Sequence, residues 1–252
     1  MTSFDIKGKM ALITGGSRGI GYAIAEKFVE SGANVIIASR TQKDLDKAAD
    51  TLSRDGGNVF PISVHAGKND SIQSMVKQSI QQFGGIDIVV NNAATNPHYG
   101  PIFTSEDSHW DKIWDVNVKG YYKVAKACVP SMTERGGGKI INIASIFGVV
   151  SKAKRATYST TKWGLIGLTK AIAHDLAPHN ILVNAVSPGF VNTELTRRIL
   201  GEKEIENLVD TIPQKRLADA KEIAKTVVFL ASDLNTYITG QNIIVDGGFT
   251  SA

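Results

Sequence analysis

Two residues in the second half of the chain, Tyr158 and Lys162, have the types and the spacing of a proton-transfer pair. The sequence around them predicts a helix over about residues 157–177, and residues four apart lie on one face of a helix. A phenol has an ordinary pKa of about 10 and is a poor acid at neutral pH, but an ammonium beside it favours the phenolate. Tyr158 is therefore a candidate proton donor to a carbonyl oxygen.

The chain contains a second pair with the same spacing, Tyr122 and Lys126. That pair is typical of the exposed face of an amphipathic helix. Spacing alone therefore does not identify a proton-transfer pair. The elements that surround each pair have to distinguish them.

A glycine-rich loop near the start of the chain has the position of a phosphate-binding loop. It follows residues 9–14, an apolar run that predicts a strand buried on both faces, and it leads into a helical pattern. Glycines let a pyrophosphate approach the amide groups at the helix N-terminus. A tight turn without a ligand is the alternative, but the place between strand and helix favours a dinucleotide. The residues of this predicted site are Gly15, Ser17, Arg18, Gly19, Ile20 and Gly21.

The residues at the end of the second predicted strand, residues 34–39, bear on the choice of cofactor. A site for NAD(H) has a carboxylate there, which binds the ribose hydroxyls. This chain has Ser39 and then Arg40, with Arg18 in the glycine loop. Guanidinium groups match the geometry of a phosphate, so these residues predict NADP(H). The alternative for Arg40 is a solvated loop charge.

Strands and helices alternate along the rest of the chain. Strands are expected at 59–64, 86–90, 139–145, 181–187 and 242–248, and helices at 71–83, 110–133, 157–177 and 219–231. This alternation predicts an α/β fold, a Rossmann-like doubly wound parallel sheet of about seven strands with helices on both faces. We expect a single domain over residues 1–252, with a substrate flap at about 190–217.

Polar residues at strand ends are further candidates, because such sheets bind ligands at the carboxyl ends of their strands. Asn91 and Ala93 follow one strand, and the Asn91 amide could contact a cofactor or tie strand ends together. Ser145 ends another strand, where its hydroxyl could donate to a carbonyl oxygen or could belong to an ordinary loop. Asn117 lies within the predicted helix 110–133. It could be a surface residue, or it could disturb the helix and hold water through its side chain or a freed carbonyl.

The bulk composition argues against several classes of protein. The chain has 252 residues, 42% of them hydrophobic, and a formal charge of +4 without basic runs, so nucleic-acid binding is not indicated. No apolar run approaches a membrane span and residues 1–7 lack a signal core, so we expect no membrane partner and a cytoplasmic location. Cys128 is the only cysteine and the five histidines are scattered, so no metal site is expected.

Taken in order, these motifs resemble the classical subgroup of the short-chain dehydrogenase/reductase family over essentially the whole chain. Within that family, Ser17-Arg18, Ser39-Arg40 and residues 238–248 are most similar to the 3-oxoacyl-(acyl-carrier-protein) reductases. The motifs that carry the family resemblance are Thr14-Gly15 to Gly21, Asn91-Asn92-Ala93, Asn117, Ser145, Tyr158-x-x-x-Lys162 and Pro188-Gly189.

The resemblance implies a role for each of these residues. Tyr158 would be the catalytic acid/base, in preference to Tyr122, because Ser145 and Asn117 precede it in the family order. Ser145 and Tyr158 would hold the substrate oxygen. Lys162 would lower the pKa of Tyr158 and bind the nicotinamide ribose, and Asn117 would hold a water in a proton relay. Further cofactor contacts would come from Pro188, Gly189, Val191 and Thr193.

Three positions depart from the family pattern. His65 stands where relatives usually have an aspartate that meets the adenine, and Ala94 stands where glycine is common. His174 occupies the place of an arginine that helps to dock the acidic carrier protein in acyl-carrier-protein reductases. The role of His65 is left open.

The leading expectation is an NADP(H)-dependent oxidoreductase that interconverts a carbonyl and a secondary alcohol by hydride transfer. Its substrate would be a small-molecule carbonyl or an acyl thioester, with a 3-oxoacyl thioester first. A sugar, polyol or secondary-alcohol dehydrogenase of the same family is the alternative. A non-catalytic dinucleotide-sensing protein would be a different class. The resemblance also implies a homotetramer.

Overall fold

The computed structural model describes residues 4–54 and 56–251. In this part of the chain seven strands, all parallel, form one sheet in the order β3-β2-β1-β4-β5-β6-β7. Successive strands are added on one side of β1 up to β3 and on its other side from β4 onward. This reversal of strand order confirms the predicted doubly wound, Rossmann-like fold. The strands are β1 (Met10–Thr14), β2 (Asn34–Ser39), β3 (Asn58–Ser63), β4 (Ile88–Asn91), β5 (Gly138–Ile143), β6 (Ile181–Pro188) and β7 (Asn242–Val245).

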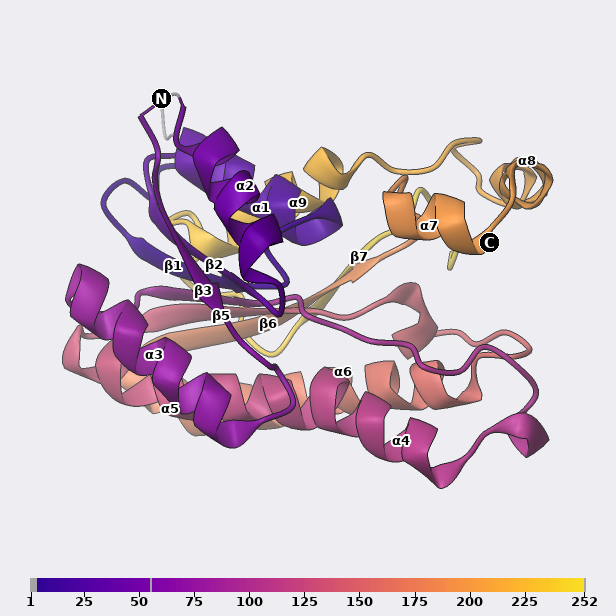
Figure 1. Ribbon diagram of the computed structural model, residues 1–252, viewed down its shortest axis with the longest axis horizontal. Coiled ribbons are helices and arrows are strands. Elements are labelled where there is room, and N and C mark those ends of the chain that lie inside the picture. Colours follow the sequence, from indigo (N-terminus) through magenta and orange to yellow (C-terminus); the bar gives the residue numbers. More distant parts are fainter. Residues whose placement is uncertain (1–3, 55, 252) are drawn as a thin grey trace.

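Helices cover both faces of the sheet, as predicted (Figure 1). One face carries α1 (Gly19–Glu30), α2 (Gln42–Leu52) and α9 (Ala220–Ala231). The other face carries α3 (Asn69–Phe83), α4 (Asp107–Trp114), α5 (Gly120–Glu134) and α6 (Ala156–Leu176). None of the described helices is long and apolar enough to cross a membrane.

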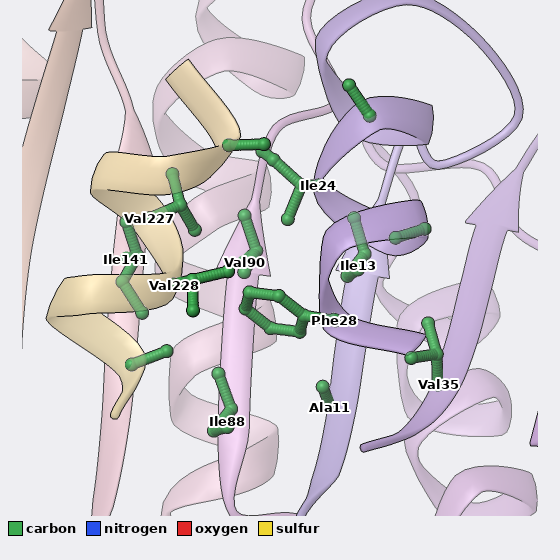
Figure 2. Packing of buried hydrophobic residues seen from close by; sticks show 14 of the residues in the cluster. Ala11, Ile13, Ile24, Phe28, Val35, Ile88, Val90, Ile141, Val227 and Val228 are labelled. Atoms are coloured by element: carbon green, nitrogen blue, oxygen red, sulfur yellow. The ribbon is translucent and has the colours of Figure 1, made fainter. Parts of the chain in front are cut away.

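A buried apolar layer joins the first set of helices to the sheet (Figure 2). Phe28 of α1 lies beside Val228 of α9 and, along β4, between Val90 and Ile88. Phe28 has no exposed surface, and burial of a side chain of this kind stabilises a fold by roughly 1.5–3 kcal/mol. This packing holds α1 against the sheet, and the glycine loop joins the start of α1 to the carboxyl end of β1.

The long helix predicted over residues 110–133 is divided in the structure. A π-helical turn, η2 (Asp115–Lys119), lies between α4 and α5. A π turn contains one residue more than an α turn and often marks a functional site. Asn117 lies inside this turn. Gly120 follows it, at a point where a Cβ would come within 2.5 Å of the Ala66 carbonyl oxygen.

The segment over residues 190–217 contains two short helices, α7 (Glu194–Ile199) and α8 (Glu202–Asp210). These helices (orange in Figure 1) lie at one end of the molecule, near the C-terminus. The Thr193 side chain caps α7 by accepting a hydrogen bond from the Thr196 amide at 3.2 Å. A bridge between Val191 and Ala218 closes the base of the segment.

Candidate active site

A cavity of about 810 Å³ lies at the carboxyl ends of the strands. Its wall contains residues that follow each of β1 to β6, together with residues at the start of α6 and in the 190–217 segment. The structure therefore brings most of the predicted site residues to one place. Those in the wall are Gly15, Ser17, Arg18, Gly19, Ile20, Ser39, Arg40, Ala93, Ser145, Tyr158, Lys162, Pro188, Gly189, Val191 and Thr193.

The glycine loop has a backbone shape that side chains would prevent. Gly15 and Gly19 have φ of 69° and 58°, in the left-handed region that favours glycine. A Cβ on Gly21 would come within 2.2 Å of the Gly15 carbonyl oxygen, so the loop and α1 are in contact there. The first turn of α1 carries no acidic residue, and its N-terminal amides are available to an anion. This cradle fits the pyrophosphate of a dinucleotide.

The far end of the cavity carries the charges that bear on the choice between NAD(H) and NADP(H). Arg18 and Arg40 are exposed in its wall, and neither forms an ion pair with the described residues. Ser39 stands at the end of β2, where a carboxylate would bind ribose hydroxyls. Asp44 also lines the cavity, in the first turn of α2. His65 lies in the wall too, and its Nδ1 accepts a hydrogen bond from the Gly67 amide at 3.3 Å.

Lys162 lies beside Tyr158 at the carboxyl end of β5. Its Nζ donates a hydrogen bond to the Ile143 carbonyl oxygen at 2.8 Å and lies 5.6 Å from the centroid of the Tyr158 ring. The residue is only 2% exposed. Burial disfavours the charged ammonium and lowers the pKa of Lys162 to about 7.

The pKa of the Tyr158 phenol is raised, because burial outweighs the opposing effects of a hydrogen bond with Ser145 and the charge of Arg155. This direction corrects the expectation that Lys162 lowers it. Burial also lowers the pKa of Lys162, so that at neutral pH only part of the protein carries the ammonium charge that would favour the phenolate. In this structure Tyr158 is a protonated donor rather than a phenolate.

Ser145 connects β5 to this pair. It follows the last residue of β5 by two positions and is 8% exposed. Its Oγ accepts a hydrogen bond from the Phe147 amide at 3.2 Å. The hydroxyl is thereby oriented beside Tyr158, so both could donate to one oxygen atom in the cavity.

Asn117 and Asn91 do not reach the cavity wall. The Asn117 Oδ1 accepts from the Thr95 amide at 2.8 Å, and its Nδ2 donates to the Thr95 carbonyl at 3.0 Å and to Thr161 Oγ1 at 3.4 Å. With its side chain engaged, the backbone carbonyl in the π turn is the group that could hold a water. The Asn91 Nδ2 donates to Asn142 Oδ1 at 3.0 Å, so Asn91 ties β4 to β5.

The neighbouring Asn92 lines the cavity instead of Asn91. Its Nδ2 donates to the carbonyl oxygens of Thr14 and Gly15 at 3.1 and 3.0 Å, which ties the glycine loop to the end of β4. Gly21 also lies outside the wall and acts through its contact with Gly15. Sequence reasoning did not single out Asn92, although alternation of side chains along a strand gives successive residues different surroundings.

The second pair is remote from this site. Tyr122 is 42% exposed on α5, with Lys126 Nζ 5.8 Å from its ring centroid, and neither residue lines the cavity. Sequence reasoning also missed Phe147, Arg155 and Phe190 in the wall. Within residues 4–54 and 56–251, no group of three histidine, cysteine or acidic side chains could hold a metal ion.

The family model described as enoyl-(acyl carrier protein) reductase matches residues 15–250 of this chain. The chain belongs to the short-chain dehydrogenase/reductase family. As a classical short-chain dehydrogenase/reductase it is an enzyme that interconverts CH–OH and C=O groups with NAD(P). The cavity of this oxidoreductase thus contains Tyr158, whose phenol has a raised pKa, together with Ser145 and the buried Lys162.

Curated relatives and solved structures of short-chain dehydrogenase/reductases match nearly the whole chain. The human dehydrogenase/reductase SDR family member 4 is 39% identical over 253 residues, covering 100% of this chain and 91% of that protein. The 3-oxoacyl-[acyl-carrier-protein] reductase FabG of Staphylococcus epidermidis is 39% identical, covering 95% of this chain and 98% of the other. L-Sorbose reductase from Gluconobacter frateurii, solved with NADPH and L-sorbose, is 34% identical with a TM-score of 0.93, covering 99% of each chain.

Proposed function

We propose that this enzyme is an NADP(H)-dependent carbonyl reductase. The observation that carries the choice of NADP(H) is the pair Arg18 and Arg40, exposed and unpaired in the cavity wall, with Ser39 in place of the carboxylate that NAD(H) sites use. The NADPH complex of the sorbose reductase adds support from a related structure.

Four residues of this chain would do the chemistry at the other end of the cavity. NADPH, when bound, supplies the hydride. Tyr158 donates the proton to the carbonyl oxygen, and Ser145 donates a second hydrogen bond to that oxygen as charge develops on it. Lys162 binds the nicotinamide ribose and accompanies Tyr158 in the proton transfer. Asn117 holds a water of the proton relay through its backbone carbonyl.

The remaining predicted residues would bind and cover the cofactor. The glycine loop holds the pyrophosphate, and residues after β4 and β6 meet the nicotinamide end. Residues 190–217 form a flap over the site within a single domain, since their α7 contributes Glu194, Thr196 and Arg198 to the cavity wall. Thr193 lies 3.7 Å from the position of a Cβ on Gly19 in the glycine loop, and the centroid of the Phe190 ring lies 6.1 Å from that of Phe147, which supports that role.

Two substrate classes follow from the relatives. A 3-oxoacyl thioester is the first candidate, supported by the identity to the Staphylococcus enzyme over nearly the full length of both chains. A ketose is the second, supported by the sorbose reductase. His174 is exposed in the last turn of α6, where an arginine would favour an acidic carrier protein. A thioester substrate therefore need not arrive on a carrier.

Steady-state oxidation of NADPH and NADH against an acetoacetyl thioester, a diketone, a quinone and several ketoses tests the proposal. We expect a kcat/KM for NADPH at least about 10-fold above that for NADH, because Arg binds a phosphate through charge-assisted bonds. Equal use of the two cofactors would contradict the NADP(H) preference. Silence of every carbonyl despite tight NADPH binding would contradict the reductase.

We also propose a homotetramer in the cytoplasm. The exposed aromatic side chains of Tyr122 on α5 and Trp163 on α6, 42% and 54% exposed, support contacts between subunits through these helices. Light scattering should give four times the 27.0 kDa mass of one chain. A single-chain mass would contradict it.

A further inference from the structure

Arg155 brings a positive charge to the reacting end of the cavity. It immediately precedes α6, three positions before Tyr158, and it lines the cavity together with Ser145 and Tyr158. Its Cζ lies 6.0 Å from the centroid of the Tyr158 ring. The charge is therefore close to the place where a carbonyl would meet the Tyr158 hydroxyl.

The guanidinium has no partner among the described residues. Its Nε is buried and makes no hydrogen bond, and none of the ion pairs in this part of the chain includes Arg155. A buried donor without an acceptor costs free energy, and most such donors in folded proteins are paired. An acceptor brought by a ligand would satisfy this one.

Aromatic rings hold the guanidinium in place without using its N–H groups. Its Cζ is 4.5 Å from the centroid of Tyr99, in the loop after β4, and 5.1 Å from that of Phe147, in the segment after β5. Contact with aromatic faces orients a guanidinium and leaves the donors at its edge for other partners. That edge has the fork geometry that binds the two oxygens of a carboxylate or phosphate.

The local field also favours an anion. The first turn of α6 has no acidic residue, and the N-terminal end of a helix carries partial positive charge. The acidic residues of the cavity wall, Asp44, Asp115 and Glu194, form no ion pair with Arg155.

We propose that Arg155 binds an anionic group of the substrate, a carboxylate or a phosphate a few bonds from the reacting carbonyl. The inference rests on the proposed carbonyl reductase, and it favours anionic carbonyl compounds over the neutral thioester and ketose that the relatives suggest. Arg155 is then a specificity-determining residue. A neutral ketone in the same position would leave Nε buried and unpaired, so neutral compounds should be poorer substrates.

Matched pairs of substrates that share a ketone and differ in charge test this. 3-Oxobutanoate is compared with its ethyl ester and its N-acetylcysteamine thioester, and dihydroxyacetone phosphate with dihydroxyacetone. The wild-type enzyme should prefer the charged member of a pair. Arg155→Gln should lower kcat/KM for the charged member by about 10- to 100-fold, chiefly through KM, and for the neutral members by less than about threefold. Which pair responds distinguishes a carboxylate from a phosphate.

Two further variants separate binding of an anion from other roles of Arg155. Arg155→Lys should restore part of the preference for charge, and Lys152→Gln, which removes an exposed positive charge outside the cavity wall, should leave it unchanged. An equal loss on charged and neutral members would make Arg155 a positioning residue for Tyr158 and would overturn the proposal. Preference of the wild-type enzyme for neutral members would overturn it as well, while the carbonyl reductase would stand.

A binding measurement decides the matter without turnover. Malonate and inorganic phosphate are titrated calorimetrically into the wild-type and Arg155→Gln proteins saturated with NADPH, so that the cofactor's own phosphate sites are filled. Weaker binding of either anion to the variant, by about 10-fold or more, supports the proposal. Equal binding, or no binding to either protein, overturns it. Silence of all substrate pairs would count separately against the proposed function.

Discussion

The ammonium of Lys162 and the carbonyl of Ile143 are joined by a hydrogen bond of 2.8 Å, which fixes α6 against the carboxyl end of β5. The Tyr121 hydroxyl donates to the same carbonyl at 3.3 Å. Lys162 therefore keeps its position through a neutral acceptor. With no carboxylate as partner, burial is what determines its protonation.

Replacing Lys162 by methionine should stabilise the cofactor-free protein at pH 7. The pKa of Lys162 is about 10.5 in the unfolded chain and about 7 in the folded protein. As the pH falls from 10.5 to 7, the unfolded chain therefore takes up a proton that the folded protein does not, and the free energy of unfolding decreases. Lys162→Met should thus raise the free energy of unfolding by on the order of 3–4 kcal/mol at pH 7 and by little at pH 10. Urea unfolding of both proteins at the two pH values measures this. An advantage that grows with pH would contradict it.

Tyr158→Phe should lower kcat by about 10²- to 10⁴-fold, because the proton donor is lost. NADPH affinity, measured by fluorescence titration, should change little. Tyr122→Phe is the matched control, since Tyr122 has the same spacing to a lysine but lies outside the cavity. Near-normal turnover of Tyr158→Phe would remove Tyr158 from its proposed role.

Arg40→Ala should weaken NADPH binding by about 10-fold or more and NADH binding by far less, because only NADPH carries the 2′-phosphate. Arg54→Ala, at an exposed arginine outside the cavity wall, is the control for the overall charge. Dissociation constants for both cofactors check the prediction. Parallel losses for NADPH and NADH would mean that Arg40 does not contact the phosphate.

Gly21→Ala should disrupt the glycine loop, since its Cβ would lie 2.2 Å from the Gly15 carbonyl oxygen and 2.5 Å from Asn92 Nδ2. We expect NADPH binding to weaken by at least about 10-fold, as the cradle for the pyrophosphate has to shift. Gly167→Ala in α6 is the control, because nothing lies within 4 Å of its added Cβ and alanine favours a helix. Unchanged NADPH affinity in Gly21→Ala would show that the loop adapts.

Asn117→Ala removes three hydrogen bonds, two to the backbone of Thr95 and one to Thr161 Oγ1. The variant should lose about 1–3 kcal/mol of stability and should also turn over more slowly, because the π turn and the loop after β4 are no longer tied together. Asn58→Ala, at an exposed asparagine whose Nδ2 bonds Asn34, should be nearly neutral. Thermal unfolding and kcat measure both effects. A fully stable, fully active Asn117→Ala would contradict the tie.

The fold follows from local patterns, and these were readable in the sequence. Buried runs such as residues 34–39 coincide with β2, and the glycine loop between β1 and α1 lies where the pattern placed it. No helix was predicted between β2 and β3, although Leu45, Ala48, Ala49 and Leu52 form the buried face of α2. That spacing is a helical signal, so the helix could have been found.

Other features of the site depend on tertiary contacts and have no local signal. The pKa of Lys162 depends on how deeply its side chain is buried, and the spacing of Lys162 from Tyr158 in the sequence does not reveal that burial. Arg155 acquires its setting from Tyr99, more than fifty residues earlier in the chain. The engagement of Asn117 with Thr95 and Thr161 likewise joins distant segments.

The π turn over residues 115–119 makes the number of residues between α4 and α5 a structural requirement. Each residue of a helix turns the following ones by about 100°, so deleting one residue here would rotate α4 by that angle relative to α5. Trp114 would then leave α6, where its ring lies 3.3 Å from the position of a Cβ on Gly164. The number of residues in the turn, more than their identity, keeps the two helices in register with the helix that carries Tyr158.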